Sequence, residues 1–216
     1  MTILARVQPP GSAALWWDYG RLELYQMNNL HVAQEGPSPH ALRTFLGLQA
    51  PGAPPSDKSG RRQGNRLVAG LAVHESAVLL NCRIGAGSVG QGCVLVNVVA
   101  PSVSLEHALL VNATSAAAVV GSRGVLYNVV HADAAAPLSA DAVRADVFMG
   151  GRQLVVRSTI ETDGGTAWKQ TLPGNALSFE GVHQANQKLD VTECQAEAGA
   201  AHRKVAGEVE RRGGWS

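Results

Sequence analysis

A chain of 216 residues with 45% apolar side chains is long enough for about one domain with a substantial core. Its formal net charge is +1, from 18 Lys and Arg against 17 Asp and Glu, so we expect neither nucleic acid nor an anionic membrane as a partner. Only 16% of residues are charged and 24 are glycine, which excludes a coiled coil or a disordered tail and favours turn-rich packing.

The N-terminal segment, residues 1–48, is rich in aromatic residues and is predicted to end a preceding domain or to form an interface. Within it, the alternation of RLELY from Arg21 to Tyr25 predicts a short strand. Ser38, Pro39 and the later Gly47 predict a short helix with an N-cap, a first-turn proline and a glycine stop. Residues 49–64, rich in proline and glycine, predict a linker.

Residues 65–160 carry the feature that decides the fold, an internal repeat. Between residues 76 and 132 only Arg83, Glu106 and Arg123 are charged. In the same region VLLN, VLVN, LLVN and VLYN recur, and their asparagines are separated by 16, 15 and 16 residues. The runs are short, rich in Val and bounded by Gly or Ser, as strands are. The sequence therefore predicts a mainly β fold, a single-stranded β-solenoid without α-helix between residues 76 and 132.

Equivalent residues of successive solenoid coils stack about 4.8 Å apart. The repeated asparagines are therefore predicted to form a ladder whose amides hydrogen-bond from coil to coil. We interpret this ladder as structural rather than as a ligand site; it consists of Asn81, Asn97, Asn112 and Asn128. The residues just before them are predicted to stack in one interior column: Leu80, Val96, Val111 and Tyr127.

Residues 161–216 are predicted to form a turn followed by a C-terminal α-helix. Two β-like runs between Asp146 and Ile160 precede the turn at Asp163. The four residues from Thr192 fit a capping box. The apolar residues after it recur at steps of 4, 3, 4 and 4 and define one helical face: Cys194, Ala198, Ala201, Val205 and Val209.

Several motifs that resemble functional sites are interpreted as structural. Gly85, Gly87 and Gly90 match the dinucleotide-binding glycine pattern, but a turn and a strand follow where that site needs a helix. Ser88 is interpreted as a small turn residue rather than a nucleophile for the same reason. Three histidines are spaced by 33 and 24 residues, which are not whole coils, so no zinc site is predicted: His74, His107 and His131.

The three cysteines have no CxxC spacing. Their odd number and their separation predict buried thiols in a reducing compartment rather than disulfides or a metal site. They are Cys82, Cys93 and Cys194. The first residues, MTILARVQPPGS, lack the apolar core of a secretory signal, and no uninterrupted apolar run is long enough to span a membrane. We therefore expect a soluble intracellular protein.

The stretch NCRIGAGSVGQGCVLVNVVA resembles the hexapeptide-repeat turns of left-handed β-helices. The flanking segments WWDYGRLELYQMNNL, ALRTFLG and GNALSFEGVHQAN resemble the C-terminal part of sugar-1-phosphate nucleotidylyltransferases, in particular plastid-type UDP-glucose pyrophosphorylase-like proteins. This resemblance implies a left-handed hexapeptide-like β-helix. It also implies a catalytic Rossmann-like domain or a second protomer as the partner, and the chloroplast stroma or the cytoplasm as the location.

The catalytic parts of that family are missing from this chain. Neither its GxGTR-like loop nor its Pro-Lys pair is present, so no catalytic residue is assigned. We expect a non-catalytic portion or a truncated relative, with no cofactor of its own and Mg²⁺ only if it is joined to a catalytic domain. Two alternatives stay open: a trimeric hexapeptide acyltransferase with His107 or His131 as general base, and a solenoid that binds an unrelated protein.

Overall fold

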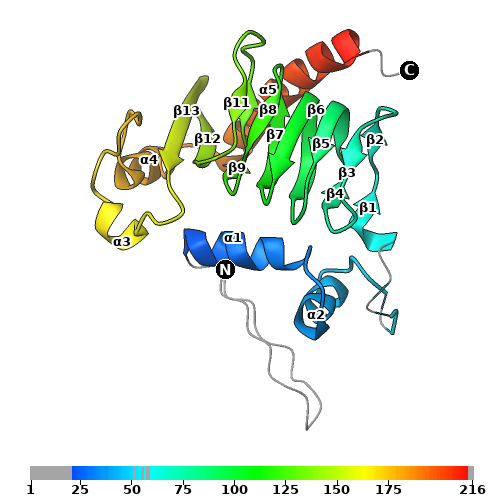
Figure 1. Ribbon diagram of the computed structural model, residues 1–216. Coiled ribbons are helices and arrows are strands. Elements are labelled where there is room, and N and C mark those ends of the chain that lie inside the picture. Colours follow the sequence, from blue (N-terminus) through cyan, green and yellow to red (C-terminus); the bar gives the residue numbers. More distant parts are fainter. Residues whose placement is uncertain (1–20, 51, 55, 57–58, 214–216) are drawn as a thin grey trace.

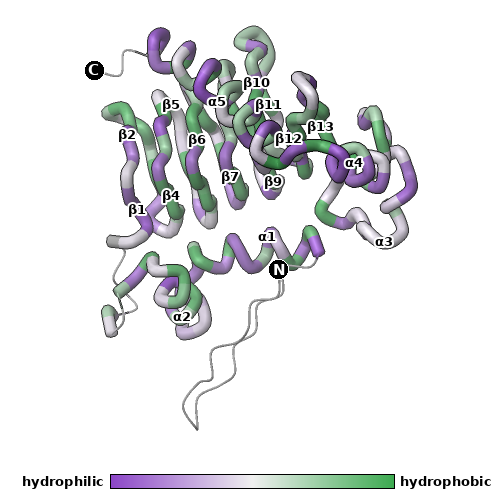
Figure 2. Tube along the Cα trace, turned by 180° about the vertical axis from the view of Figure 1, so that it is seen from behind, coloured by the Kyte–Doolittle hydropathy of each residue, from purple (hydrophilic) through white to green (hydrophobic). Residues whose placement is uncertain are grey.

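A parallel β-solenoid of about five turns forms the centre of the molecule in a computed structural model (Figure 1). The structure describes residues 21–50, 52–54, 56 and 59–213, so the part of the predicted aromatic-rich segment before residue 21 lies outside the described residues. Two N-terminal helices lie along one side of the coils, and a long C-terminal helix lies along another (Figures 1 and 2). The predicted mainly β fold with a C-terminal helix is confirmed.

The described elements follow one another as helices, coils and helices. The strands are β1 (Arg62–Gln63), β2 (Arg66–Leu67), β3 (Ala72–Val73), β4 (Val78–Leu80), β5 (Arg83–Val89), β6 (Val94–Glu106), β7 (Leu109–Ser115), β8 (Val119–Ser122), β9 (Val125–Tyr127), β10 (Val130–His131), β11 (Leu138–Ser139), β12 (Val143–Met149) and β13 (Arg152–Ser158). The helices are α1 (Leu22–His31), α2 (Pro37–Phe45), the 3₁₀ turn η1 (Ser59–Arg61), α3 (Gly164–Ala167), α4 (Phe179–Asn186) and α5 (Val191–Gly213).

Strand pairing reproduces the sequence repeat. The paired strands are parallel throughout, except that β12 and β13 form an antiparallel hairpin at the end of the coils. Paired positions in successive coils are separated by 17, 16, 15, 16 and 18 residues. One such series of paired residues is Arg62, Leu79, Leu95, Leu110, Leu126 and Arg144. The first of these pairings involves β1, which lies within the segment predicted as a linker. Between residues 76 and 132 the described elements are all strands, as predicted.

The interior of the solenoid is filled by the middle residue of each apolar triplet. Leu79, Leu95, Leu110 and Leu126 are all 0% exposed and belong to one core cluster. The predicted column does form in register and consists of Leu80, Val96, Val111 and Tyr127. The prediction that this column lies in the interior of the coil is wrong. Because successive strand residues point to opposite faces, these four face outward, and the aliphatic three pack in a second cluster with α1 and α2.

The strand predicted from Arg21 to Tyr25 is also wrong, because α1 occupies this stretch. Leu22, Tyr25 and Leu30 pack against the outer cluster of the solenoid, and their spacing is that of one helical face. A window of five residues was too short to distinguish this spacing from strand alternation. Tertiary packing of the apolar face decides the outcome.

The two other helix predictions need small corrections at their starts. Helix α2 begins at Pro37 after Gly36, one residue before the predicted Ser38 cap, and it ends as predicted before Gly47, whose φ is 72°. Helix α5 begins at Val191 because the side chain of Asp190 accepts hydrogen bonds from the amides of Thr192 (2.7 Å) and Glu193 (3.0 Å). No helix in the described part of the chain is long and apolar enough to cross a membrane.

Candidate functional site: the amide groove

A cleft of about 1180 Å³ lies between one corner of the solenoid and α5. Its floor carries the four asparagines of the sequence repeat and Gly64, which lies one coil before Asn81. Arg66 and Arg83 lie two residues after Gly64 and Asn81 and are paired in register. Its roof is α5, through small residues such as Ala198 and Ala206 and through His202. We call this cleft the amide groove. The structure brings together the predicted ladder and the predicted helical face, which are far apart in the sequence.

Backbone geometry explains why asparagine recurs at this corner. Asn81, Asn97, Asn112 and Asn128 have φ values of 53°, 54°, 52° and 53°, in the left-handed region. Asparagine tolerates this region better than other residues with a side chain. Gly64, with φ of 67°, holds the same position one coil earlier, where a Cβ atom would approach Asn81 Oδ1 to 2.2 Å. Sequence reasoning missed Gly64 because it looked only for asparagine.

Hydrogen bonds along the column are fewer than a continuous ladder would have. Asn97 Nδ2 donates to Asn112 Oδ1 at 2.8 Å. Asn128 instead turns toward other groups, since its Nδ2 donates to the carbonyl of Asp146 at 2.9 Å. The side chain of Asn81 is exposed. The column is thus held mainly by its backbone conformation, with one amide pair in the middle.

Substitution of Asn97 separates these two contributions. Both variants lose the hydrogen bond of the side-chain amide. Asn97→Gly tolerates positive φ because it has no Cβ atom, whereas Asn97→Ala keeps a Cβ atom without the polar side chain that lets asparagine adopt the left-handed region. We expect the alanine variant to be less stable than the glycine variant by about 1 kcal/mol. Urea unfolding of both variants measures the difference. Equal stabilities would mean that the corner conformation contributes nothing to the choice of asparagine.

His202 of α5 joins the helix to the floor of the groove. Its Nε2 lies 3.1 Å from Asn128 Oδ1, and its Nδ1 lies 2.9 Å from the hydroxyl of Thr114. Because the Asn128 amide nitrogen donates to Asp146, Oδ1 must accept, so Nε2 of His202 carries the proton. Nδ1 then accepts from Thr114. Both ring nitrogens are engaged, so the neutral imidazole has a single tautomer, with its proton on Nε2.

Burial lowers the pKa of His202 below its usual 6.5, and the nearby carboxylate of Asp146 opposes this only in part. A histidine with a lowered pKa in the folded state binds fewer protons than the unfolded chain when the pH falls below its ordinary value. The stabilising effect of neutral His202 is therefore present above about pH 6.5 and is lost as the pH falls toward the folded pKa.

We expect the unfolding free energy of the wild type to fall more than that of His202→Gln between about pH 7.5 and pH 5. Denaturant unfolding of both proteins at each pH measures this, and the variant corrects for every other titrating group. A loss that is equal in both proteins would show that His202 is not the group responsible.

Two charged contacts fix the ends of the groove. The side chain of Asp146 is buried, and the residue is 2% exposed. Its carboxylate accepts two hydrogen bonds from Arg144, from Nε and from Nη2, both at 2.8 Å. It also accepts from the amide of Val130 at 2.9 Å and from Gln153 Nε2 at 2.6 Å. At the other end, Arg83 of β5 forms an ion pair with Glu210 of α5. No local motif predicted either contact, because the partners of the second are separated by 127 residues.

The glycine pattern at residues 85–90 serves coil packing. Gly85 and Gly87 lie in β5, where a Cβ atom would approach the carbonyl oxygens of Pro101 and Val103 to 2.2 and 1.9 Å. Ser88 lies in the same strand and is not at the start of a helix. These positions therefore lack the strand-to-helix turn that dinucleotide binding or a nucleophilic serine needs.

The three histidines of the coils are not hydrogen-bonded to one another in the described part of the chain. His74 Nδ1 is 2.9 Å from the hydroxyl of Ser76, and His131 Nε2 donates to the carbonyl of Ala136 at 2.9 Å. His107 is exposed at a left-handed corner with φ of 48°. Within residues 21–50, 52–54, 56 and 59–213, no group of three His, Cys, Asp or Glu side chains could hold a metal ion.

The three thiols are free. Cys82 and Cys93 are buried, as predicted, and burial raises the pKa of Cys82 to about 11. Cys194 is only half-buried and lines the amide groove.

No family model, curated protein or solved structure matches this chain. Its class is therefore defined by its own structure, a parallel β-solenoid with a C-terminal helix laid along one corner.

Proposed function

We propose that this chain is the non-catalytic β-helix portion, or a truncated relative, of a sugar-1-phosphate nucleotidylyltransferase of the UDP-glucose pyrophosphorylase-like type. In this proposal it packs against a catalytic Rossmann-like domain or a second protomer. It has no cofactor of its own, and Mg²⁺ belongs to the catalytic partner. The sequence resemblance that suggests this function also suggests the chloroplast stroma or the cytoplasm as the location.

The observation that carries the proposal is the use of the polar side chains in the amide groove. Neutral His202 has a single tautomer, Asp146 accepts four hydrogen bonds, and Arg83 is paired with Glu210. A general acid or base must exchange protons with a substrate, whereas both ring nitrogens of His202 and both carboxylate oxygens of Asp146 already have partners. His202 and the pair of Arg83 with Glu210 hold α5 against the coils, and Asp146 joins the last strands to one another, which supports a structural role.

The apolar side chains exposed on the described surface support a packing role. Most of the largest ones come from the helices and connections around the coils: Met27, Phe45, Leu46, Trp168, Leu177 and Val191. Residues of this kind are favoured where a surface becomes buried against a partner. We infer that these helical segments, rather than the coils, contact the partner domain or protomer.

Sedimentation velocity over a wide range of concentrations tests the second-protomer form of the proposal. We expect self-association that Met27→Lys weakens, because Met27 is 52% exposed on α1. Val120→Lys, at a position 37% exposed on β8, is the matched control and should leave the association unchanged. A monomer at every concentration, or equal weakening by both variants, would contradict self-association through the helices.

A further inference from the structure

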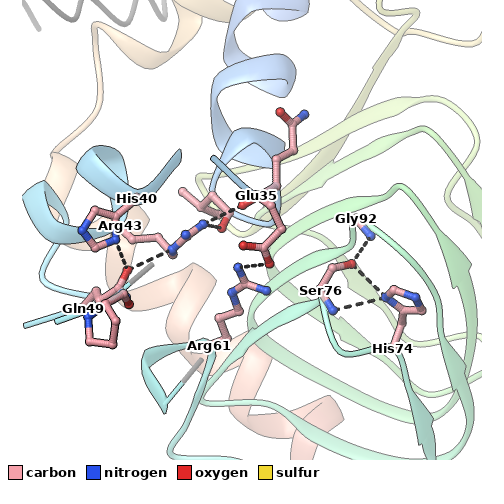
Figure 3. A network of polar contacts seen from close by, with 11 residues as sticks. Glu35, His40, Arg43, Gln49, Arg61, His74, Ser76 and Gly92 are labelled. Atoms are coloured by element: carbon pink, nitrogen blue, oxygen red, sulfur yellow. Dashed lines mark hydrogen bonds and ion pairs between the residues drawn. The ribbon is translucent and has the colours of Figure 1, made fainter. Parts of the chain in front are cut away.

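A second polar network lies between α2 and the first coil, away from the amide groove (Figure 3). Its centre is formed by Arg43 of α2 and Arg61 of η1, which are each 1% exposed. Arginine is rarely buried to this extent unless its charge is paired and all its donors find acceptors. The acceptors of these two side chains therefore decide what the network can do.

The burial of Arg43 is explained in large part by the carbonyl groups at the end of α1, which accept its hydrogen bonds. Its Nη1 donates to the carbonyls of Val32 (2.9 Å) and Gln34 (2.7 Å), just past the C-terminus of that helix, where a cation is favourable. Its Nε donates to Gln49 Oε1 at 3.2 Å. The remaining nitrogen, Nη2, is buried and has no acceptor among the described residues.

Arg61 has far fewer acceptors. Its Nη2 forms an ion pair with Glu35 Oε1 at 2.9 Å, while its Nε and Nη1 are buried without an acceptor in the described part of the chain. A buried donor that loses water without gaining an acceptor is costly, most of all on a charged group. The side chain of Glu35 itself is 59% exposed, so it covers Arg61 from the solvent side.

The electrostatics of the network point to an excess of positive charge. Burial, and then the charge of Arg61, lower the pKa of Arg43, while Glu35 opposes this. Burial and Arg61 also lower the pKa of Arg62, the next residue along the chain. The positive charges of the two buried guanidinium groups thus repel each other. The carboxylate of Glu35, which compensates the charge of Arg61, is largely exposed to solvent.

We propose that Arg61 and Arg43 form a binding site for a tetrahedral oxyanion of the phosphate type, which enters by displacing the carboxylate of Glu35. The free Nε and Nη1 of Arg61 and the free Nη2 of Arg43 supply the donors. Guanidinium groups bind such oxygens with two or more parallel bonds, and two of them match a dianion in charge. Glu35 holds the site closed when no anion is bound. This site is independent of the proposed function, because it uses no residue of the amide groove.

Thermal unfolding with inorganic phosphate at constant ionic strength tests the site. A ligand that binds only the folded state raises Tm, and we expect a saturable rise of about 3–6 °C with phosphate and sulfate. Acetate should give much less. A parallel titration with glycerol 2-phosphate distinguishes the free ion from an esterified phosphate group.

Two variants identify the residues. Glu35→Gln removes the competing charge and should tighten phosphate binding by about tenfold in isothermal titration. Arg61→Lys keeps the positive charge but lacks the forked donors, so it should abolish the saturable Tm rise. Arg152→Gln, an exposed arginine at the start of β13, is the control and should behave like the wild type.

A wild-type Tm that responds to phosphate no more than to potassium chloride would overturn the proposal, whatever the variants do. An equal response to acetate would overturn the tetrahedral class of ligand. If Arg61→Lys does not fold, Glu35→Gln still decides, because unchanged or weaker phosphate binding by that variant contradicts displacement of Glu35.

Discussion

Replacing Asp146 with alanine is expected to lower the free energy of unfolding by about 3–5 kcal/mol. The carboxylate of Asp146 pairs with Arg144, whose side chain is 11% exposed, and it also accepts from the amide of Val130 and from Gln153. Removing it leaves a nearly buried guanidinium and a buried amide without their acceptor. Unpaired buried charges are among the few causes of such large losses.

Guanidinium chloride unfolding measures this loss, with Asp133→Ala as the matched control. Asp133 is exposed and accepts one hydrogen bond, from the amide of Ala135 at 2.9 Å, so its replacement should cost no more than about 1 kcal/mol. Equal effects of the two substitutions would show that the contacts of Asp146 do not hold the last coil.

Leu110→Ala is expected to cost about 2–5 kcal/mol, through lost burial and the cavity left between neighbouring coils. Leu110 is 0% exposed and stacks in register between Leu95 and Leu126. A coil can close this cavity only by shifting against both neighbours, which their backbone hydrogen bonds oppose.

Leu177→Ala is the control, because Leu177 is 37% exposed in the connection before α4. This substitution should lower the free energy of unfolding by less than about 1 kcal/mol. Chemical denaturation of both variants gives the comparison. A cost for Leu110→Ala within the range of its control would contradict a packed solenoid interior.

The repeat was predictable because one local requirement recurs in every coil. A left-handed corner favours asparagine, so Asn81 and its equivalents mark the coil length directly in the sequence. The face of each strand was not predictable in the same way. The triplets VLL, VLV and LLV are apolar throughout because both faces are covered, the inner one by other coils and the outer one by α1 and α2. No alternation remained to show that Leu79, and not Leu80, points inward.

The sequence predicted two separate parts of the site but not that they lie together. The asparagine column came from the repeat, and the apolar face of α5 came from its helical spacing. Their meeting depends on His202 reaching Thr114 and Asn128, across 88 and 74 residues. A single histidine in a helix forms no local sequence pattern that predicts such contacts. Arg43 and Arg61 were missed for the same reason, since only folding buries them.

The most direct test of the central claim, that the polar groups of the amide groove hold the fold rather than perform chemistry, is a pyrophosphate-release assay. The purified chain is incubated with Mg²⁺, UTP or GTP, and a panel of sugar 1-phosphates, beside an active nucleotidylyltransferase as the positive control. We predict no release above the blank, because phosphoryl-group transfer needs a phosphate-holding loop and metal-binding carboxylates in one cleft, and the sequence has no GxGTR-like loop. Robust release that depends on both substrates would contradict the account.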